Sequence, residues 1–163
     1  MFKKFIATAA LSLAASASFA MPTGIYAGVT AGTTDVSDLD GNKGSFGAFA
    51  GYGFNEAIAV EVGYRQHGTW ELYGSDVKVK QTDISVLGAL PLAASLDLYG
   101  RLGYAHAKVE AEYYGYRDDE SVDNTLVGIG LAYRFSANLS GRVEVQKPAS
   151  DTTNVSLGLA WQF

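Results

Sequence analysis

Residues 155–163 read Val-Ser-Leu-Gly-Leu-Ala-Trp-Gln-Phe, and their strict alternation is the strongest indication of the fold. Every second position is apolar, whereas the positions between are small or polar; the apolar ones are Val155, Leu157, Leu159, Trp161 and Phe163. Because successive side chains of a β-strand point to opposite faces, the stretch predicts a strand with one apolar and one polar face. The apolar face ends in Trp and Phe, as at the aromatic girdle of a transmembrane barrel. A strand of a soluble sandwich would show the same alternation, so the rest of the chain has to separate the two.

The same period of two recurs along most of the chain. We expect strands over residues 25–32, 45–54, 60–65, 79–90, 98–105, 127–134, 142–146 and 154–163. The phase is ambiguous only around Val86 and Leu87, where two apolar residues follow each other. The pattern predicts an all-β fold of about eight strands, each near the length that crosses a bilayer when tilted.

The predicted connectors alternate in length. Residues 55–57, 91–95 and 136–138 are short, whereas residues 32–44, 66–78, 107–123 and 147–153 are longer, polar loops. A soluble barrel has no reason for this asymmetry, but an outer-membrane barrel has short periplasmic turns and long outer loops. Since a sheet in lipid cannot leave an edge unpaired, the first and last strands should pair. We therefore predict an eight-stranded antiparallel up-and-down transmembrane β-barrel over residues 21–163, with an interior packed by its own side chains.

The first 20 residues have the layout of a secretory signal peptide. Lys3 and Lys4 precede an apolar run over residues 5–13, and Ser18-Phe19-Ala20 is a small-x-small cleavage signal. The apolar run is too short for a bilayer-spanning helix. We expect cleavage after Ala20 and a location in the cell outer membrane.

Composition excludes several functions. The chain has no cysteine, which rules out disulfides, thiol chemistry and cysteine-ligated metal. It carries 17 acidic and 12 basic residues, and two of the basic ones lie in the signal segment, so nucleic-acid binding is disfavoured.

Several segments resemble the OmpA-type transmembrane barrel. They are residues 47–52 (GAFAGY), 59–65 (AVEVGYR), 95–103 (SLDLYGRLG), 137–146 (ANLSGRVEVQ) and the last nine residues. The resemblance covers the barrel alone, and we expect the peptidoglycan-binding domain of full-length OmpA proteins to be missing. The architecture is thus similar to free-standing small barrels such as OmpX and the opacity-type surface antigens.

The resemblance implies a charge network inside the barrel. By position, Glu61 and Arg142 match an acidic and a basic member of it, and Arg101 and Glu144 match neighbouring charges. Ala132 stands where the family has a Glu, and residues 79–90 offer no interior Lys, which argues against the switchable pairing proposed for OmpA. We expect a structural cluster in which Glu61 pairs with Arg142, Arg101 or both and Glu144 completes the set, because a lone buried charge is costly.

Catalytic and metal sites are weakly indicated. His67 and His106 could form a pair at the outer rim, but the favoured interpretation is two exposed loop histidines, since nothing nearby has ligand spacing. Some small outer-membrane barrels modify lipid A and need a His with Ser or Asp, yet the final strands carry no His. The acidic, tyrosine-containing loop over residues 108–123 could bind a divalent cation or a protein, but a solvated acidic loop is favoured.

These observations favour a monomeric, non-enzymatic protein without cofactor or metal, with a structural or surface-interaction role in adhesion or envelope integrity. The alternatives are a small-solute pore and a lipid A-modifying enzyme. Expected partners are outer-membrane lipids and lipopolysaccharide, the barrel-assembly machinery, for which Trp161 and Phe163 form the C-terminal signal, and a host or neighbouring surface protein that contacts the long loops.

Overall fold

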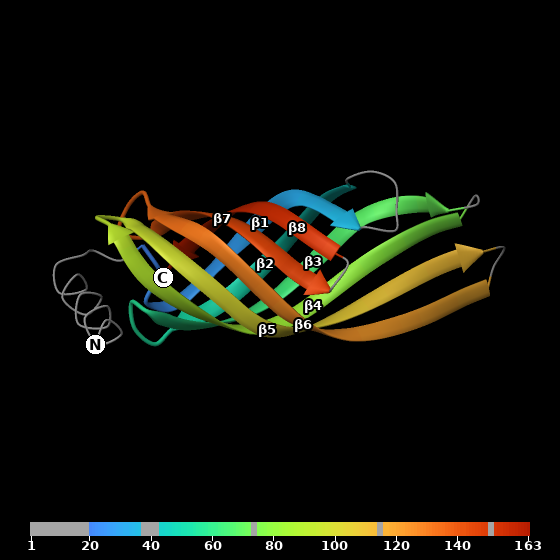
Figure 1. Ribbon diagram of the computed structural model, residues 1–163, viewed down its shortest axis with the longest axis horizontal. Coiled ribbons are helices and arrows are strands. Elements are labelled where there is room, and N and C mark those ends of the chain that lie inside the picture. Colours follow the sequence, from blue (N-terminus) through green and yellow to red (C-terminus); the bar gives the residue numbers. More distant parts are fainter. Residues whose placement is uncertain (1–19, 37–42, 73–74, 114–115, 150–151) are drawn as a thin grey trace, which may run out of the picture.

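The computed structural model is a closed antiparallel barrel of eight strands (Figure 1). It describes residues 20–36, 43–72, 75–113, 116–149 and 152–163. The strands are β1 (Gly24–Val36), β2 (Lys43–Gly53), β3 (Ile58–Leu72), β4 (Ser75–Ala93), β5 (Leu96–Tyr113), β6 (Tyr116–Arg134), β7 (Leu139–Ala149) and β8 (Thr152–Gln162). Among the described residues, no helix has the length and apolarity needed to cross a membrane.

Each strand pairs with its neighbours in sequence, and β1 closes the barrel against β8. The register of that closure runs from Tyr26 opposite Gln162 to Val36 opposite Thr152. The predicted fold class is therefore confirmed, including the pairing of the first and last strands. Within the barrel wall, where β1 pairs with β8, the described strands are paired on both sides, as a sheet surrounded by lipid requires.

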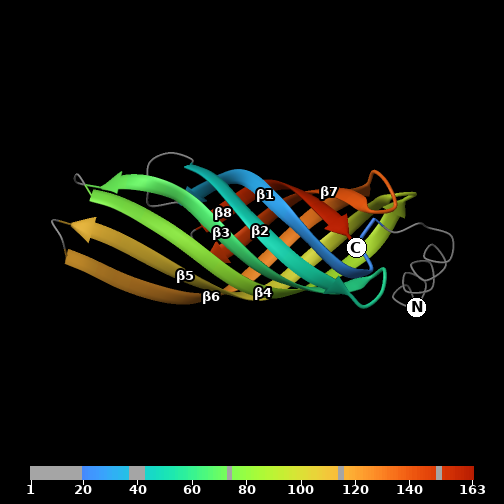
Figure 2. The same cartoon turned by 180° about the vertical axis from the view of Figure 1, so that it is seen from behind.

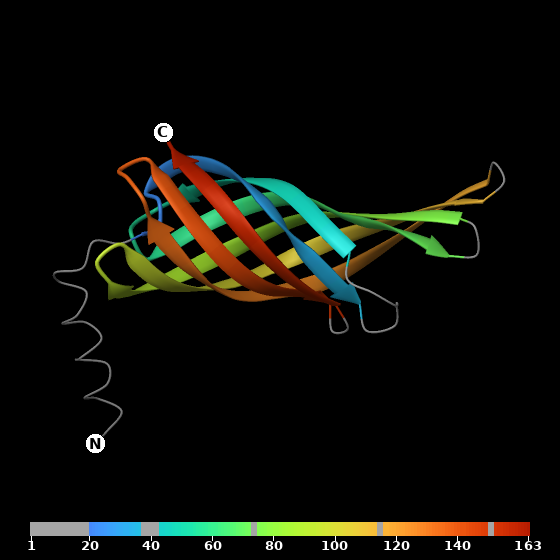
Figure 3. The same cartoon turned by 90° about the horizontal axis from the view of Figure 1, so that it is seen from above.

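The two ends of the barrel differ. The turns β2–β3, β4–β5 and β6–β7 lie at one end, together with Ala20 and Phe163, and this is called the short-turn end. At the opposite, long-hairpin end, β3–β4 and β5–β6 project well beyond the other strands (Figures 2 and 3). Their projecting parts are called the β3–β4 arm (residues 69–78) and the β5–β6 arm (residues 109–120).

The arms correct the sequence prediction, which placed polar loops over residues 66–78 and 107–123. In the structure the strands continue, with Leu72 opposite Ser75 and Tyr113 opposite Tyr116. The reason is visible in the sequence: residues 107–113 still alternate between polar and apolar types, so the ladder with the neighbouring strand can extend. Polarity alone did not mark the end of these strands.

The outer wall is apolar. Ile25, Phe46, Leu102 and Leu157 are each more than 60% exposed, an arrangement that water would penalise. The ambiguous phase on β4 is settled, because Val86 faces outward and Leu87 is fully buried. Aromatic pairs flank this belt at the short-turn end, with Tyr133 and Phe135 ring centroids 5.3 Å apart. This belt and its aromatic rim are the surface of a lipid-embedded barrel.

A charged cluster inside the barrel

The interior contains a compact cluster of charged side chains. Glu61 comes from β3, Arg101 from β5, and Arg142 and Glu144 from β7. All four lie on the inward phase of their strands, and both carboxylates are 1% exposed. The period of two places them there: their neighbours Val62, Leu102 and Val143 face outward.

Arg101 joins the two carboxylates. Its Nη2 donates to Oε2 of Glu61 at 2.5 Å and its Nε donates to Oε1 of Glu144 at 2.6 Å. Arg142 donates from Nη1 to Oε1 of Glu61 at 2.6 Å, and its Nε lies 4.0 Å from Oε2 of Glu144. The structure thus brings the four sequence-selected residues together, and Glu61 contacts both arginines.

Two tyrosines donate further hydrogen bonds to the carboxylates of the cluster. The Tyr26 hydroxyl donates to Oε1 of Glu61 at 3.0 Å, and the Tyr99 hydroxyl donates to Oε2 of Glu144 at 2.8 Å. Both tyrosines are 1% exposed. Sequence reasoning did not select them, although both fall on the inward phase of their strands. The sequence did offer one indication, because each tyrosine is a large polar residue among inward positions that are otherwise mostly small.

Each tyrosine lies opposite a glycine of the next strand. Tyr26 pairs with Gly51 across β1–β2, and Tyr99 pairs with Gly130 across β5–β6. A Cβ on Gly51 would lie 2.5 Å from Cζ of Tyr26, and one on Gly130 would lie 2.7 Å from Cζ of Tyr99. The two glycines therefore provide the space that lets the rings turn toward the charges.

The arginines have further partners that the sequence analysis missed. Ser85 on β4 accepts from Nη1 of Arg101 at 2.5 Å, and Asp83 lies 3.9 Å from the same nitrogen. The guanidinium carbon of Arg142 lies 3.7 Å from the centroid of the Phe49 ring, a cation–π contact. Arginine is suited to this position because its planar fork presents several donors at once.

A second polar layer lies between the charged cluster and the long-hairpin end. Arg65 hydrogen bonds to Gln146. His67 is 4% exposed and hydrogen bonds to Thr34 at 2.8 Å and to Gln81 at 3.0 Å. The prediction of an exposed loop histidine is therefore wrong for His67, because β3 continues past it and its ring faces inward.

Asn154 completes that layer. It is fully buried, and its Nδ2 donates to the hydroxyls of Thr34 and Ser45 at 2.8 Å each. This interior network holds β1, β2 and β8 together where they approach the long-hairpin end.

His106 faces the opposite side of the wall. Its Nδ1 lies 2.6 Å from Oδ1 of Asp123, and both side chains are partly exposed on the outward faces of β5 and β6. Since His67 faces inward, the two histidines do not form a common site. Among the described residues no cluster of three metal-ligating side chains is present.

The interior leaves little free volume beside the charges. The cavity lined by Thr30, Phe49, Glu61, Arg101 and Arg142, among others, has a volume of about 10 Å³. That volume is about what one water molecule requires. The paired charges thus leave almost no free volume in this part of the interior.

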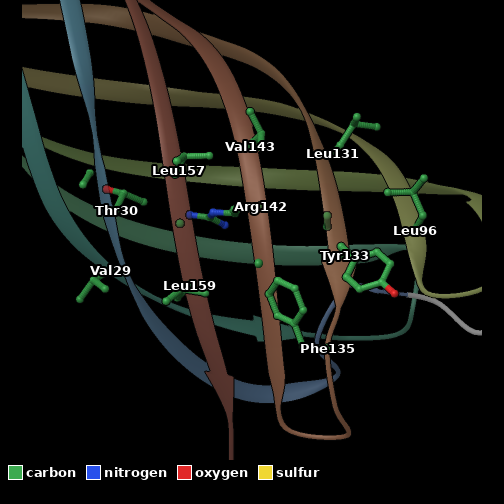
Figure 4. Close-up of a pocket in the computed structure, with 14 residues that line it drawn as sticks. Val29, Thr30, Leu96, Leu131, Tyr133, Phe135, Arg142, Val143, Leu157 and Leu159 are labelled. Atoms are coloured by element: carbon green, nitrogen blue, oxygen red, sulfur yellow. The ribbon is translucent and has the colours of Figure 1, made fainter.

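The outer wall has a larger, apolar groove of about 630 Å³ (Figure 4). It is lined by outward side chains of β1, β6, β7 and β8, including Val29, Leu131, Val143, Leu157 and Leu159. Gly141 faces outward within it, opposite Tyr133 and Leu159 in the register, and a Cβ there would lie 2.6 Å from Cε2 of Phe135, so the Phe135 ring covers this position. Its apolar lining fits a hydrocarbon environment.

The two residues of the predicted C-terminal signal lie on the outer wall. Trp161 is 52% exposed and Phe163 is 79% exposed. The backbone N–H of Phe163 donates to the carbonyl of Ile25 at 3.1 Å, which fixes the last residue at the barrel seam. The Phe163 side chain therefore contributes little packing to the folded barrel.

Comparisons with known proteins agree with this architecture. Residues 5–163 match the family model described as "Outer membrane protein beta-barrel domain". The chain is 28% identical to outer membrane protein A of Serratia marcescens over 138 residues, which are 72% of this chain and 38% of that protein. Outer membrane protein A of Escherichia coli O157:H7 is 27% identical over 139 residues, or 75% of this chain and 40% of that protein. The chain thus spans about two fifths of the length of these curated relatives.

Solved structures share the fold. Neisserial surface protein A superposes with a TM-score of 0.69 at 14% identity, covering 85% of this chain and 96% of that one. The N-terminal barrel of Pseudomonas aeruginosa OprF gives 0.66 at 14% identity, with 88% and 100% covered. Ail of Yersinia pestis, in complex with the heparin analogue sucrose octasulfate, gives 0.60 at 21% identity, with 85% and 96% covered.

Proposed function

This chain belongs to the outer membrane protein beta-barrel domain family, and we propose that it is a closed, non-enzymatic barrel that presents its two hairpin arms for contact at the cell surface. The interior cluster is the observation that carries the proposal. The paired Glu61, Arg101, Arg142 and Glu144 at the centre of the barrel, beside a void of about 10 Å³, support a closed interior. With the interior closed, the outer surface is the part that would carry the function.

The arms are the part of the described chain suited to such contact. β4, β5 and β6 have 18 or 19 residues, whereas β2, β7 and β8 have 11 each, so the arms extend well beyond the rim. The ladder continues to the tip of the β5–β6 arm, where Glu112 lies opposite Arg117. A paired hairpin loses less conformational freedom on binding than a loose loop does.

Charge indicates the class of partner. The β5–β6 arm contains one basic residue, Arg117, and five acidic ones: Glu110, Glu112, Asp118, Asp119 and Glu120. Ail, which has a similar fold, was solved in complex with the heparin analogue sucrose octasulfate. An acidic arm, in contrast, would repel a polyanion. We propose that the arm contacts a cationic protein surface.

Deleting the arm tests this function. Residues 109–120 are replaced by Asn-Gly, a two-residue hairpin turn, which preserves the pair of Lys108 and Ser121. Cells that display wild-type protein should adhere to an immobilised lysine-rich protein and not to heparin. The shortened variant should lose that adhesion although it folds and reaches the surface.

A second variant, which lacks only the negative charges of the arm, separates the effect of charge from that of length. Changing the five arm carboxylates to their amides keeps the length of the arm and should reduce adhesion nearly as much as deletion. Adhesion that survives both changes, or strong binding to heparin, would contradict the proposal.

A further inference from the structure

Asp97 forms an incomplete site at the short-turn end of the barrel. It is the second residue of β5, its side chain faces inward, and it is fully buried. Its Oδ2 accepts from the backbone N–H of Met21 at 2.9 Å and from that of Ala20 at 2.7 Å. Its Oδ1 is buried and has no hydrogen-bond partner among the described residues.

The nearby guanidinium does not complete this carboxylate. Nη2 of Arg134 donates to the backbone carbonyl of Met21 at 3.4 Å rather than to Asp97. A buried carboxylate that receives only two amide donors on one oxygen is costly, because neither its charge nor its second oxygen is satisfied. A cation with several N–H donors would satisfy both the charge and the second oxygen.

The chain before β1 lies in the position to supply that cation. Ala20 and Met21 are 1% and 3% exposed and belong to the same buried apolar cluster as Tyr26, Leu87 and Tyr99. Thr23 accepts from the side-chain amide of Gln162 at 3.3 Å. Residues 20–23 are therefore fastened across the short-turn end by β5, β6 and β8.

The sequence independently marks the bond next to this site. Ser18-Phe19-Ala20 is the small-x-small signal that predicts cleavage between Ala20 and Met21. Hydrolysis by a signal peptidase breaks the peptide bond between the carbonyl carbon of Ala20 and the nitrogen of Met21. Water supplies a hydroxyl to the carbonyl carbon, so that Ala20 ends in a carboxylate. The two protons released go to the Met21 nitrogen, which becomes an ammonium.

We propose that Asp97 is the binding site for the mature N-terminal ammonium of Met21. The nitrogen is already 2.9 Å from Oδ2, and an ammonium has three N–H groups where the amide has one. It can replace the donor lost with Ala20 and also supply Oδ1. Processing thereby converts an uncompensated buried charge into an ion pair, and the new terminus becomes a plug held inside the barrel.

Selective labelling of the α-amine tests the site. The full chain is exported, extracted from outer membranes and treated near neutral pH with an amine-reactive reagent, which favours the α-amine over lysines because an unperturbed α-amine loses its proton at lower pH. Mass spectrometry of the N-terminal peptide should show that it begins at Met21. It should react at least about tenfold more slowly in folded than in urea-unfolded wild-type protein, because a charge-assisted hydrogen bond must break first.

Two variants sharpen the result. Asp97→Asn should remove most of the protection, whereas Asp35→Asn, which removes an exposed carboxylate at the opposite end of the barrel, should leave it unchanged. If Asp97→Asn does not fold, the comparison of folded and unfolded wild-type protein still decides. A terminus other than Met21, or equal labelling rates in folded and unfolded wild-type protein, would overturn the proposal.

Discussion

Arg101 donates to Glu61 across the barrel interior, with 2.5 Å between Nη2 and Oε2, although 40 residues separate them in the chain. The bond links β5 to β3 without passing through the sheet ladder. Because Arg101 also contacts Glu144 on β7, it is the central cation of the cluster. The consequences of removing it should therefore exceed those of removing Arg142.

Arg101→Ala should lower the free energy of unfolding by about 3–5 kcal/mol, because it leaves two buried carboxylates short of a cation. Arg142→Ala should cost less, since Glu61 keeps Arg101. The measurement is the urea midpoint of protein refolded in detergent micelles. Lys147→Ala, which removes an exposed charge on β7, is the control and should change stability by no more than about 0.5 kcal/mol.

Coupling within the cluster is checked by a double-mutant cycle. Glu61→Ala and Arg142→Ala together should lose much less than the sum of the single losses, because the 2.6 Å contact between them can be lost only once. Additive effects would show that the pair does not interact.

Gly130→Ala should destabilise the barrel by about 1–3 kcal/mol, the range for overpacking a tight interior. Its Cβ would meet the Val143 carbonyl oxygen and the Tyr99 ring, and displacing that ring breaks the hydrogen bond to Glu144. Gly88→Ala is the matched control, because nothing lies within 4 Å of a Cβ there. Thermal or urea unfolding that affects both variants equally would contradict this account.

The sequence was sufficient to predict the barrel and the inward position of its charged residues, because side chains alternate between the two faces of a strand. A period of two assigns Glu61, Arg101, Arg142 and Glu144 to the interior without any three-dimensional information. The partners on other strands, such as Ser85 and Tyr99, depend on register and shear, which the sequence does not display. The burial of His67 was missed because a polar stretch was interpreted as a loop where the ladder in fact continues.

Single cysteines provide a clean test of orientation, since the chain has none of its own. Arg117→Cys lies near the tip of the β5–β6 arm, and Asn138→Cys lies in the turn between β6 and β7. If short turns face the periplasm, a membrane-impermeant maleimide should label the first in intact cells and the second only after lysis. Labelling of position 138 in intact cells would reverse the topology.

Phe163→Ala should reduce the amount of barrel assembled in cells and leave refolding in detergent nearly unchanged. The side chain is 79% exposed, so little packing is lost in the folded state. A defect confined to cells would then reflect recognition by the assembly machinery. Leu139→Ala, on the strand next to β8, is a comparison that should act through packing in both settings. An equal loss for Phe163→Ala in detergent would instead indicate a folding role.

Single-channel recording in planar lipid bilayers tests the closed interior most directly. Wild-type protein refolded from urea and inserted at known density should give no large, stable conductance steps, because the paired charges leave almost no free volume in their part of the interior and a second polar layer lies above them. Arg101→Ala, which removes the central cation, should give more frequent openings than wild type does. Large, long-lived steps from most wild-type molecules would contradict the account and favour a small-solute pore.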